Sequence, residues 1–127
     1  MDGKVVIVTG AGGAGVGGLG VVYARALADA GAAVVVADVD PDAAGRVAEG
    51  IVDGGGQAIG IGCDVTSDVE VAGMVQAACD AFGGVDVLVN NAGLARGKWN
   101  EALELPAADW LEILAVNTVA PVTCARA

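Results

Sequence analysis

The residues whose types and spacing could do chemistry lie in a glycine-rich segment near the start of the chain. Residues 9–20 read TGAGGAGVGGLG, between an apolar run and a helical pattern. Glycines at a helix start let backbone N–H groups approach an anion, and the positive end of the helix dipole favours a phosphate. We predict that this segment binds the diphosphate of a dinucleotide; the alternative is a loop without a ligand.

The position of the helix start decides which glycines would take part. Residues 10–15 match the pattern GxGxxG, but a helix beginning at Gly15 would hold two adjacent glycines in its first turn. Each of these would cost about 1 kcal/mol relative to alanine. We therefore expect the loop to continue to Gly17, the helix to begin near Gly18-Leu19-Gly20, and Gly10 to form the tight turn after the strand.

An aspartate follows the second apolar run. Asp38 lies 18 residues after Gly20, where a carboxylate can accept both hydroxyls of an adenosine ribose. A 2′-phosphate about 4 Å away would be repelled by about 4 kcal/mol at an effective dielectric constant of 20. No Lys or Arg lies in the glycine segment or just after Asp38 to offset this. We predict NAD rather than NADP; the alternative is a solvated acid at the end of a strand.

Short apolar runs alternate with helical patterns along the chain. Strands are expected at residues 4–9, 33–37, 58–63 and 85–89, and helices at 19–30, 41–52, 67–82 and from Pro106 onward. Asp40-Pro41 and a Ser67–Glu70 capping box are predicted to open two of the helices. This alternation predicts one doubly wound α/β domain over residues 1–127 with a parallel sheet. Its strand ends would bring Thr9, Asp38, Asp64 and Asn91 to one rim.

Composition excludes several classes of protein. Sixteen acidic and six basic residues give a net charge of −10, which argues against nucleic acid as a partner. No run approaches the ~20 apolar residues that span a bilayer, and no secretory signal pattern opens the chain, so we expect no membrane partner and a cytoplasmic location. Three cysteines without a CxxC pair, and no histidine, predict reduced structural thiols and no metal site.

Several of these motifs occur together in a known family. Thr9-Gly10 with Gly18-Leu19-Gly20, Asp38, Asp64-Val65, Asn90-Asn91-Ala92-Gly93 and Val116-Asn117 follow one another in the order found in short-chain dehydrogenases/reductases. The chain resembles the first half of that family over its whole length. The resemblance implies a Rossmann-like sheet of order 3-2-1-4, NAD(H) as cofactor, and hydride transfer between nicotinamide and an alcohol or ketone.

The resemblance also implies roles for individual residues. Asp64 and Val65 would hold the adenine ring, while Asn91, Ala92 and Gly93 would line the adenosine ribose. Asn117 would be the active-site asparagine, which bends the last helix and binds a water of a proton relay; the alternative is a side chain that bonds only backbone. Gly97-Lys98-Trp99 could border a substrate site. The family spacing allows three residues between Gly10 and Gly18, so four extra residues must bulge near the diphosphate.

The family's chemistry also needs a Tyr-x-x-x-Lys pair and a Ser, which this sequence does not supply. The single tyrosine, Tyr23, has Leu27 four residues later and is expected to be a core or interface ring. Whether the chain is an enzyme is therefore left open. The alternative to the cofactor-binding part of an oxidoreductase is a truncated, non-catalytic module that binds nucleotide or oligomerises. A homo-oligomer would form through the last helix or the exposed edge of strand 85–89.

Overall fold

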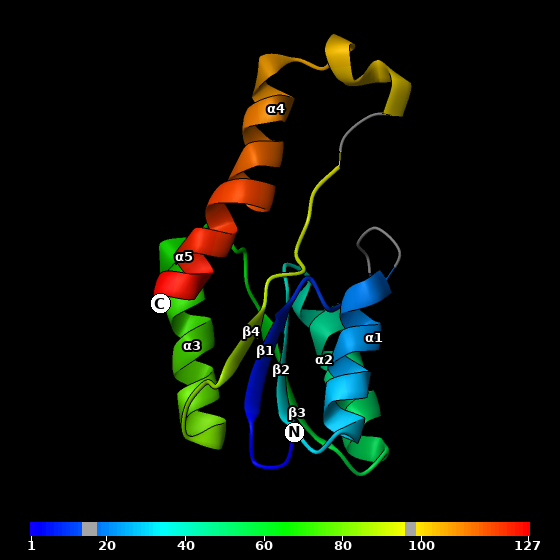
Figure 1. The fold of residues 1–127 in the computed structure, drawn as a ribbon, viewed down its shortest axis with the longest axis vertical. Helices are drawn as coiled ribbons and strands as arrows, with labels where there is room; N and C mark the ends of the chain where they lie inside the picture. Colours follow the sequence, from blue (N-terminus) through cyan, green and yellow to red (C-terminus); the bar gives the residue numbers. More distant parts are fainter. Residues whose placement is uncertain (14–17, 96–98) are drawn as a thin grey trace.

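The computed structural model of the chain describes residues 1–13, 18–95 and 99–127. Strands and helices alternate along it, as Figure 1 shows. In chain order the elements are β1 (Val5–Thr9), α1 (Leu19–Asp29), β2 (Ala33–Asp38), α2 (Pro41–Asp53), β3 (Gln57–Gly62), α3 (Asp68–Phe82), β4 (Val87–Val89), the 3-10 helix η2 (Trp99–Glu104), α4 (Ala107–Leu114), the π-helix η3 (Ala115–Val119) and α5 (Ala120–Arg126).

The strands form a parallel sheet in the order β3-β2-β1-β4, which confirms the predicted order. Ile7 of β1 pairs with Val35 of β2 on one side and with Leu88 of β4 on the other. Helices α1 and α2 cover one face of the sheet, and α3 and α5 lie on the opposite face (Figure 1). The carboxyl ends of all the described strands therefore open toward the same rim.

The core lies in two layers, one on each face of the sheet. Val6 and Val8 of β1 point into a cluster with the inner faces of α1 and α2. Ile7 points the other way, into a cluster with Met74 of α3 and Cys124 of α5. All these side chains are buried. A strand covered on both faces needs apolar residues at consecutive positions, which explains the unbroken run in β1.

Side-chain caps fix the starts of α2 and α3. Asp40 Oδ1 accepts from the backbone N–H groups of Asp42 and Ala43 at 3.0 and 3.1 Å, as predicted. At α3, Ser67 Oγ accepts from Glu70 N at 3.3 Å. The Glu70 carboxylate, however, accepts from Asp64 N at 2.8 Å. The predicted capping box is therefore only half right, because Glu70 holds the turn after β3 and does not return to Ser67.

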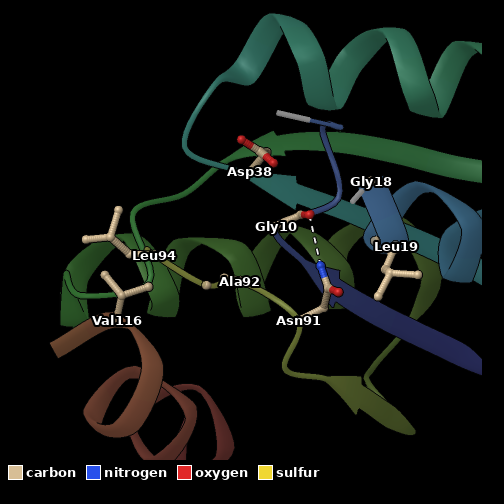
Figure 2. A pocket seen from close by; sticks show the side chains of 10 residues that line it. Gly10, Gly18, Leu19, Asp38, Asn91, Ala92, Leu94 and Val116 are labelled. Atoms are coloured by element: carbon tan, nitrogen blue, oxygen red, sulfur yellow. Dashed lines mark hydrogen bonds between the residues drawn. The ribbon is translucent and has the colours of Figure 1, made fainter. Parts of the chain in front are cut away.

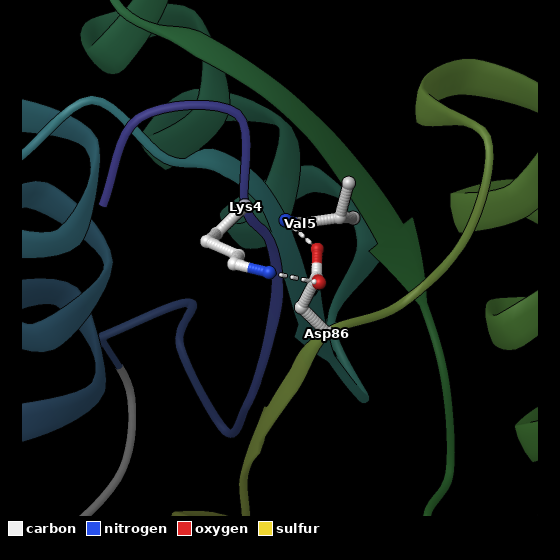
Figure 3. Close-up of polar contacts among 3 residues, drawn as sticks. All are labelled: Lys4, Val5 and Asp86. Carbon is white, nitrogen blue, oxygen red and sulfur yellow. Dashed lines mark hydrogen bonds and ion pairs between the residues drawn. The ribbon is translucent and has the colours of Figure 1, made fainter.

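The last strand is shorter than expected. Strand β4 begins at Val87, whereas the sequence predicts residues 85–89. Asp86 stands just before it, and its carboxylate accepts from Val5 N at 2.9 Å and from Lys4 Nζ at 2.7 Å (Figure 3). This carboxylate takes the Val5 N–H, so pairing between the strands begins at Val6 and Val87. Within the described residues β4 is an edge of the sheet.

The carboxyl-terminal helix is not continuous. The sequence predicts one helical pattern from Pro106, but η3 separates α4 from α5. The 3-10 helix η2 precedes it, where a loop is expected, and the Trp110 indole N–H donates to Ala102 O at 3.2 Å. Helix α4 extends away from the sheet in Figure 1. Of the helices described, none has both the length and the apolar content to cross a bilayer.

Candidate functional site

A cleft of about 230 Å³ opens at the carboxyl ends of β1, β2 and β4 (Figure 2). Most of the cofactor residues predicted from the sequence line it, together with two apolar side chains that were not predicted. The lining residues are Gly10, Gly18, Leu19, Gly20, Asp38, Asn91, Ala92, Gly93, Leu94 and Val116. Segments separated by more than a hundred residues in the sequence thus meet at one place.

The start of α1 forms one wall of the cleft. Helix α1 begins at Leu19 after Gly18, whose φ of 61° is left-handed, and this confirms the expected register. No side chain among the described residues caps the helix, and its first turn holds no acid. Its first backbone N–H groups can therefore bind an anion. Four extra residues are expected to bulge within residues 11–17, of which residues 14–17 lie outside the described residues.

The Asp38 carboxylate lies in the same cleft. Asp38 is only 6% exposed. Its Oδ2 accepts from Gly12 N at 2.7 Å, and its Oδ1 accepts from Asp40 N at 3.1 Å. A Cβ on Gly12 would lie 2.7 Å from Asp38 Cγ, so this approach requires a glycine. Each oxygen keeps a further lone pair that can accept a hydrogen bond from a hydroxyl group. The sequence pattern had not singled out Gly12.

Thr9 and Asn91 join the ends of β1 and β4. Thr9 Oγ1 accepts from Asn91 N and from Ala92 N, each at 3.1 Å. In return, Asn91 Nδ2 donates to Thr9 O and Gly10 O at 2.9 and 3.0 Å. Thr9 is 1% exposed and does not line the cleft. Its side chain therefore shapes the site by holding the backbone around it.

Asp64 and Val65, two of the predicted cofactor residues, are not among the residues that line this cleft. Val65 is buried in the same core cluster as Met74. Asp64 Oδ1 accepts from both the backbone and the hydroxyl group of Thr66, at 2.9 and 2.7 Å. The role in holding adenine that the family resemblance implies for them stays a prediction.

Asn117 lies beside the cleft but does not line it. Its Oδ1 accepts from Leu94 N at 2.8 Å, and its Nδ2 donates to Leu94 O at 2.9 Å. Both of these hydrogen bonds join the side chain to backbone, and the role in a proton relay that the resemblance implies for Asn117 stays a prediction. Of the residues predicted to border a substrate site, Gly97 and Lys98 lie outside the described residues, as does the Trp99 side chain.

The remaining candidates for chemistry do not face the cleft. Tyr23 is 41% exposed on α1, so it is not a core ring, and it lines a separate apolar groove with Leu27 and Val89. Cys63 and Cys124 are buried, and burial raises the pKa of the Cys63 thiol to about 11. No group of three metal-ligating side chains occurs within the described ranges. The cleft can thus bind a ligand, but no side chain that lines it is an acid-base group other than Asp38.

Comparison with known proteins shows to which family the chain is related. The chain is 41% identical over 117 residues to the 7alpha-hydroxysteroid dehydrogenase of Escherichia coli K12, which covers 92% of this chain and 43% of the relative. It is 39% identical over 127 residues to (-)-isopiperitenol/(-)-carveol dehydrogenase of Mentha piperita, covering 99% of this chain and 46% of that one. The chain therefore spans less than half the length of these relatives.

Solved structures agree with the sequence comparison. A 7 alpha-hydroxysteroid dehydrogenase complexed with NADH and 7-oxo glycochenodeoxycholic acid superposes with a TM-score of 0.87 at 38% identity, covering 98% of this chain and 46% of that one. The profile of the family described as short chain dehydrogenase matches residues 4–127. The chain belongs to the short-chain dehydrogenase family.

Proposed function

We propose that this chain is the NAD-binding part of a short-chain oxidoreductase whose reaction transfers hydride between nicotinamide and an alcohol or ketone. One observation carries the proposal: the buried Asp38 carboxylate and the uncapped start of α1 line the same cleft. The carboxylate is suited to sugar hydroxyls and the helix start to a diphosphate, and a dinucleotide carries both groups side by side. The similarity to a hydroxysteroid dehydrogenase solved in complex with NADH supports this.

The residues of the cleft fit such a ligand. A Cβ added at Gly18 would meet nothing within 4 Å, so open space lies before the helix start. At Gly20, by contrast, a Cβ would lie 2.6 Å from Asn91 Nδ2, so the helix packs closely onto the strand ends. The diphosphate would be held by the first N–H groups of α1, and the adenosine ribose by Asp38. When bound, the nicotinamide supplies the hydride chemistry.

Asp38 also favours NAD over NADP in this proposal. A 2′-phosphate would stand beside a carboxylate that two backbone N–H groups already hold in place. Repulsion of up to about 4 kcal/mol corresponds to a preference of up to roughly a thousandfold for NAD. No Lys or Arg occurs between residues 31 and 45 to offset it.

Turnover needs an acid-base group besides the ribose-binding Asp38, and the described lining of the cleft contains no other. Tyr23 lies in α1, beside Val89, and does not line the cleft. We therefore expect the 127-residue chain alone to bind NADH without oxidising or reducing a substrate. This is the behaviour of the non-catalytic module, which stays the alternative for the protein as a whole. A cytoplasmic location also stays a prediction.

A titration tests the proposal directly. The purified chain is titrated with NADH and NADPH by fluorescence, and then mixed with secondary alcohols and NAD. We expect NADH to bind more tightly than NADPH. Asp38→Asn should weaken NADH binding at least tenfold, because an amide nitrogen cannot accept a hydrogen bond from a ribose hydroxyl group. Asp53→Asn, at the exposed end of α2, makes the same charge change and should leave binding unaltered. No binding by the wild-type chain would refute the proposal.

We also propose that a second copy of this chain covers α4, the first part of the predicted last helix. The side chains of Trp110, Leu111 and Leu114 on α4 are 40%, 68% and 47% exposed. Light scattering after gel filtration should show a dimer or larger assembly, which Leu111→Asp should dissociate. Val69→Asp, at an 82% exposed position on α3, is the matched control and should not. A monomeric wild-type chain would contradict the idea.

A further inference from the structure

An apolar groove runs along the open edge of the sheet, outside the cofactor cleft. Tyr23, Ala26 and Leu27 of α1 line it together with Val89 of β4, and its volume is about 350 Å³. We call it the α1–β4 groove. Of the described residues that line it, none is charged. Figure 1 shows β4 between α1 on one side of the sheet and α3 on the other. The groove and the strand edge therefore belong to one surface.

The backbone of β4 directs hydrogen-bonding groups out of the sheet. Asp86 N donates to Val5 O at 2.9 Å, so the backbone groups of Asp86 face β1. Because adjacent residues of a strand direct these groups to opposite sides, the N–H and C=O of Val87 face away from β1, and those of Leu88 face β1. Among the described strands none lies beyond β4. Groups left unpaired at an apolar edge readily bind another strand.

The side chains of β4 specify what kind of strand fits. Val87 and Val89 pack against the core cluster on the α1 face of the sheet, and Leu88 packs against the cluster that contains Met74. All three residues of the strand are half-buried. A strand that extends the sheet here must be apolar on both of its faces. The β4 strand of a second copy of this chain meets that requirement.

We infer that a second copy of this chain pairs its β4 antiparallel to this one, about a two-fold axis at Leu88. This register pairs the whole strand, because Val87 of each copy then lies opposite Val89 of the other. Val89 O accepts only a long bond from Thr9 Oγ1, at 3.4 Å, and keeps a lone pair for the pairing. The same axis brings the two α1–β4 grooves together on one face, where the two Tyr23 rings would fill them.

The charges of the chain permit this contact. Each copy carries a net charge of −10, so two copies repel each other at a distance. Next to β4, however, the Asp86 carboxylate already pairs with Lys4 Nζ at 2.7 Å. In the inferred register Asp86 lies opposite Asn90 of the other copy, which is uncharged. No like charges therefore meet at the strands, and added salt should strengthen the dimer by screening the net charge.

The size of the surface sets the expected affinity. Six partly exposed side chains that each give up roughly 50 Å², with the strand backbone between them, come to roughly 400 Å² per copy. Weak and transient interfaces bury about this much, roughly 800 Å² over both partners. We therefore expect a dimer with a Kd on the order of 50 μM, which forms only in concentrated solution.

Sedimentation of Leu111→Asp tests the contact, because this variant removes the interface proposed for α4. With both interfaces the wild-type chain would form assemblies larger than a dimer, and Leu111→Asp should leave the dimer joined through β4. Adding Tyr23→Asp should weaken this dimer at least tenfold, since two carboxylates would be buried in an apolar seam. Val52→Asp, at a 51% exposed position on α2, makes the same charge change and should leave the dimer unaltered. Tyr23→Ala replaces Tyr23→Asp if circular dichroism shows that the latter has lost its fold.

Hydrogen exchange of single amides in Leu111→Asp reads the strand pairing without touching it. The Val87 amide should exchange about fourfold more slowly at ~300 μM than at ~5 μM, because about three quarters of the chains are then paired. The Leu88 amide, which faces β1, is the internal control and should not depend on concentration. A Leu111→Asp chain that stays monomeric at ~300 μM would leave the groove to a different polypeptide and overturn the inference. A dimer that Tyr23→Asp leaves unchanged, or Val87 exchange independent of concentration, would also overturn it. These outcomes do not depend on whether the chain binds NADH.

Discussion

Gly20 is the residue at which the close packing of α1 onto the strand ends can be tested. It is the second residue of α1 and is buried. A Cβ at this position would lie 2.6 Å from Asn91 Nδ2, 2.8 Å from Ala11 Cα and closer still to Gly10 O. Real Cβ atoms do not come this close to backbone. Gly20→Ala must therefore push α1 away from the strand ends.

The cost of this change can be worked out from its neighbours. The Asn91 amide cannot move without losing its hydrogen bonds to Thr9 O and Gly10 O, each of which contributes about 1 kcal/mol. Overpacking of a rigid site costs about 1 to 3 kcal/mol, and the higher helix propensity of alanine offsets up to about 1 kcal/mol. We expect Gly20→Ala to lower the free energy of unfolding by about 2 kcal/mol. For a chain of this length that lowers Tm by about 7 °C.

Circular dichroism melts of three variants check this value. Gly45 in α2 and Gly73 in α3 are matched controls, because a Cβ at either position would meet nothing within 4 Å. Gly45→Ala and Gly73→Ala should each raise the free energy of unfolding by up to about 1 kcal/mol through helix propensity alone. If Gly20→Ala also melts at or above the wild-type temperature, α1 does not pack on the strand ends as described, and the geometry of the cleft is wrong.

Three other predictions concern stability and pH. Ser67→Ala should lower the free energy of unfolding by about 1 kcal/mol in urea melts, because Glu70 N loses its cap. Burial raises the pKa of Cys63 from 9.0 to about 11, so the native state favours the neutral thiol. The free energy of unfolding should therefore be unaffected by this thiol below pH 9 and should fall by up to about 3 kcal/mol as the pH rises toward 11. Cys63→Ala should remove the part of the alkaline fall that comes from Cys63, while the part from Cys124, whose pKa burial also raises, should remain. Hydrogen bonds from Lys4 and Val5 lower the pKa of Asp86, so stability should fall in acid below pH 3.8, and melts of Asp86→Asn should lack that component.

Much of the fold followed from short-range patterns. The apolar runs located the strands to within two residues, and the glycines placed the start of α1 correctly at Leu19. The length of β4 did not follow, because it depends on a carboxylate bonding a distant strand: Asp86 accepts from Val5 N, and the pattern of residues 85–89 contains no sign of this. The distortion of the last helical segment at η3 contains Asn117, the residue at which the resemblance implies a bend.

The site was predictable where a motif and the topology agreed. Asp38 and the glycines of α1 follow strands of known order, so parallel pairing brings them to one rim. The resemblance implies that Val65 helps to hold the adenine ring; the structure shows Val65 buried in the core cluster with Met74, and that role stays a prediction. Val116 precedes Asn117 in one of the motifs of the resemblance, but that motif does not indicate that the Val116 side chain lines the cleft. Leu94 belongs to none of the motifs, and only the structure shows that both apolar residues line the cleft.

The polar side chains at this rim make most of their hydrogen bonds with backbone groups. Thr9 and Asn91 bond the ends of β1 and β4, Asp38 bonds Gly12 and Asp40, and Asn117 bonds Leu94. A cleft held in this way has its shape before any ligand arrives, so little ordering cost is left for binding. We therefore expect the described part of the cleft to bind NADH although β4 is an edge strand within the described residues. Titration of the 127-residue chain with NADH, followed by a turnover assay, tests this, and we expect binding without turnover.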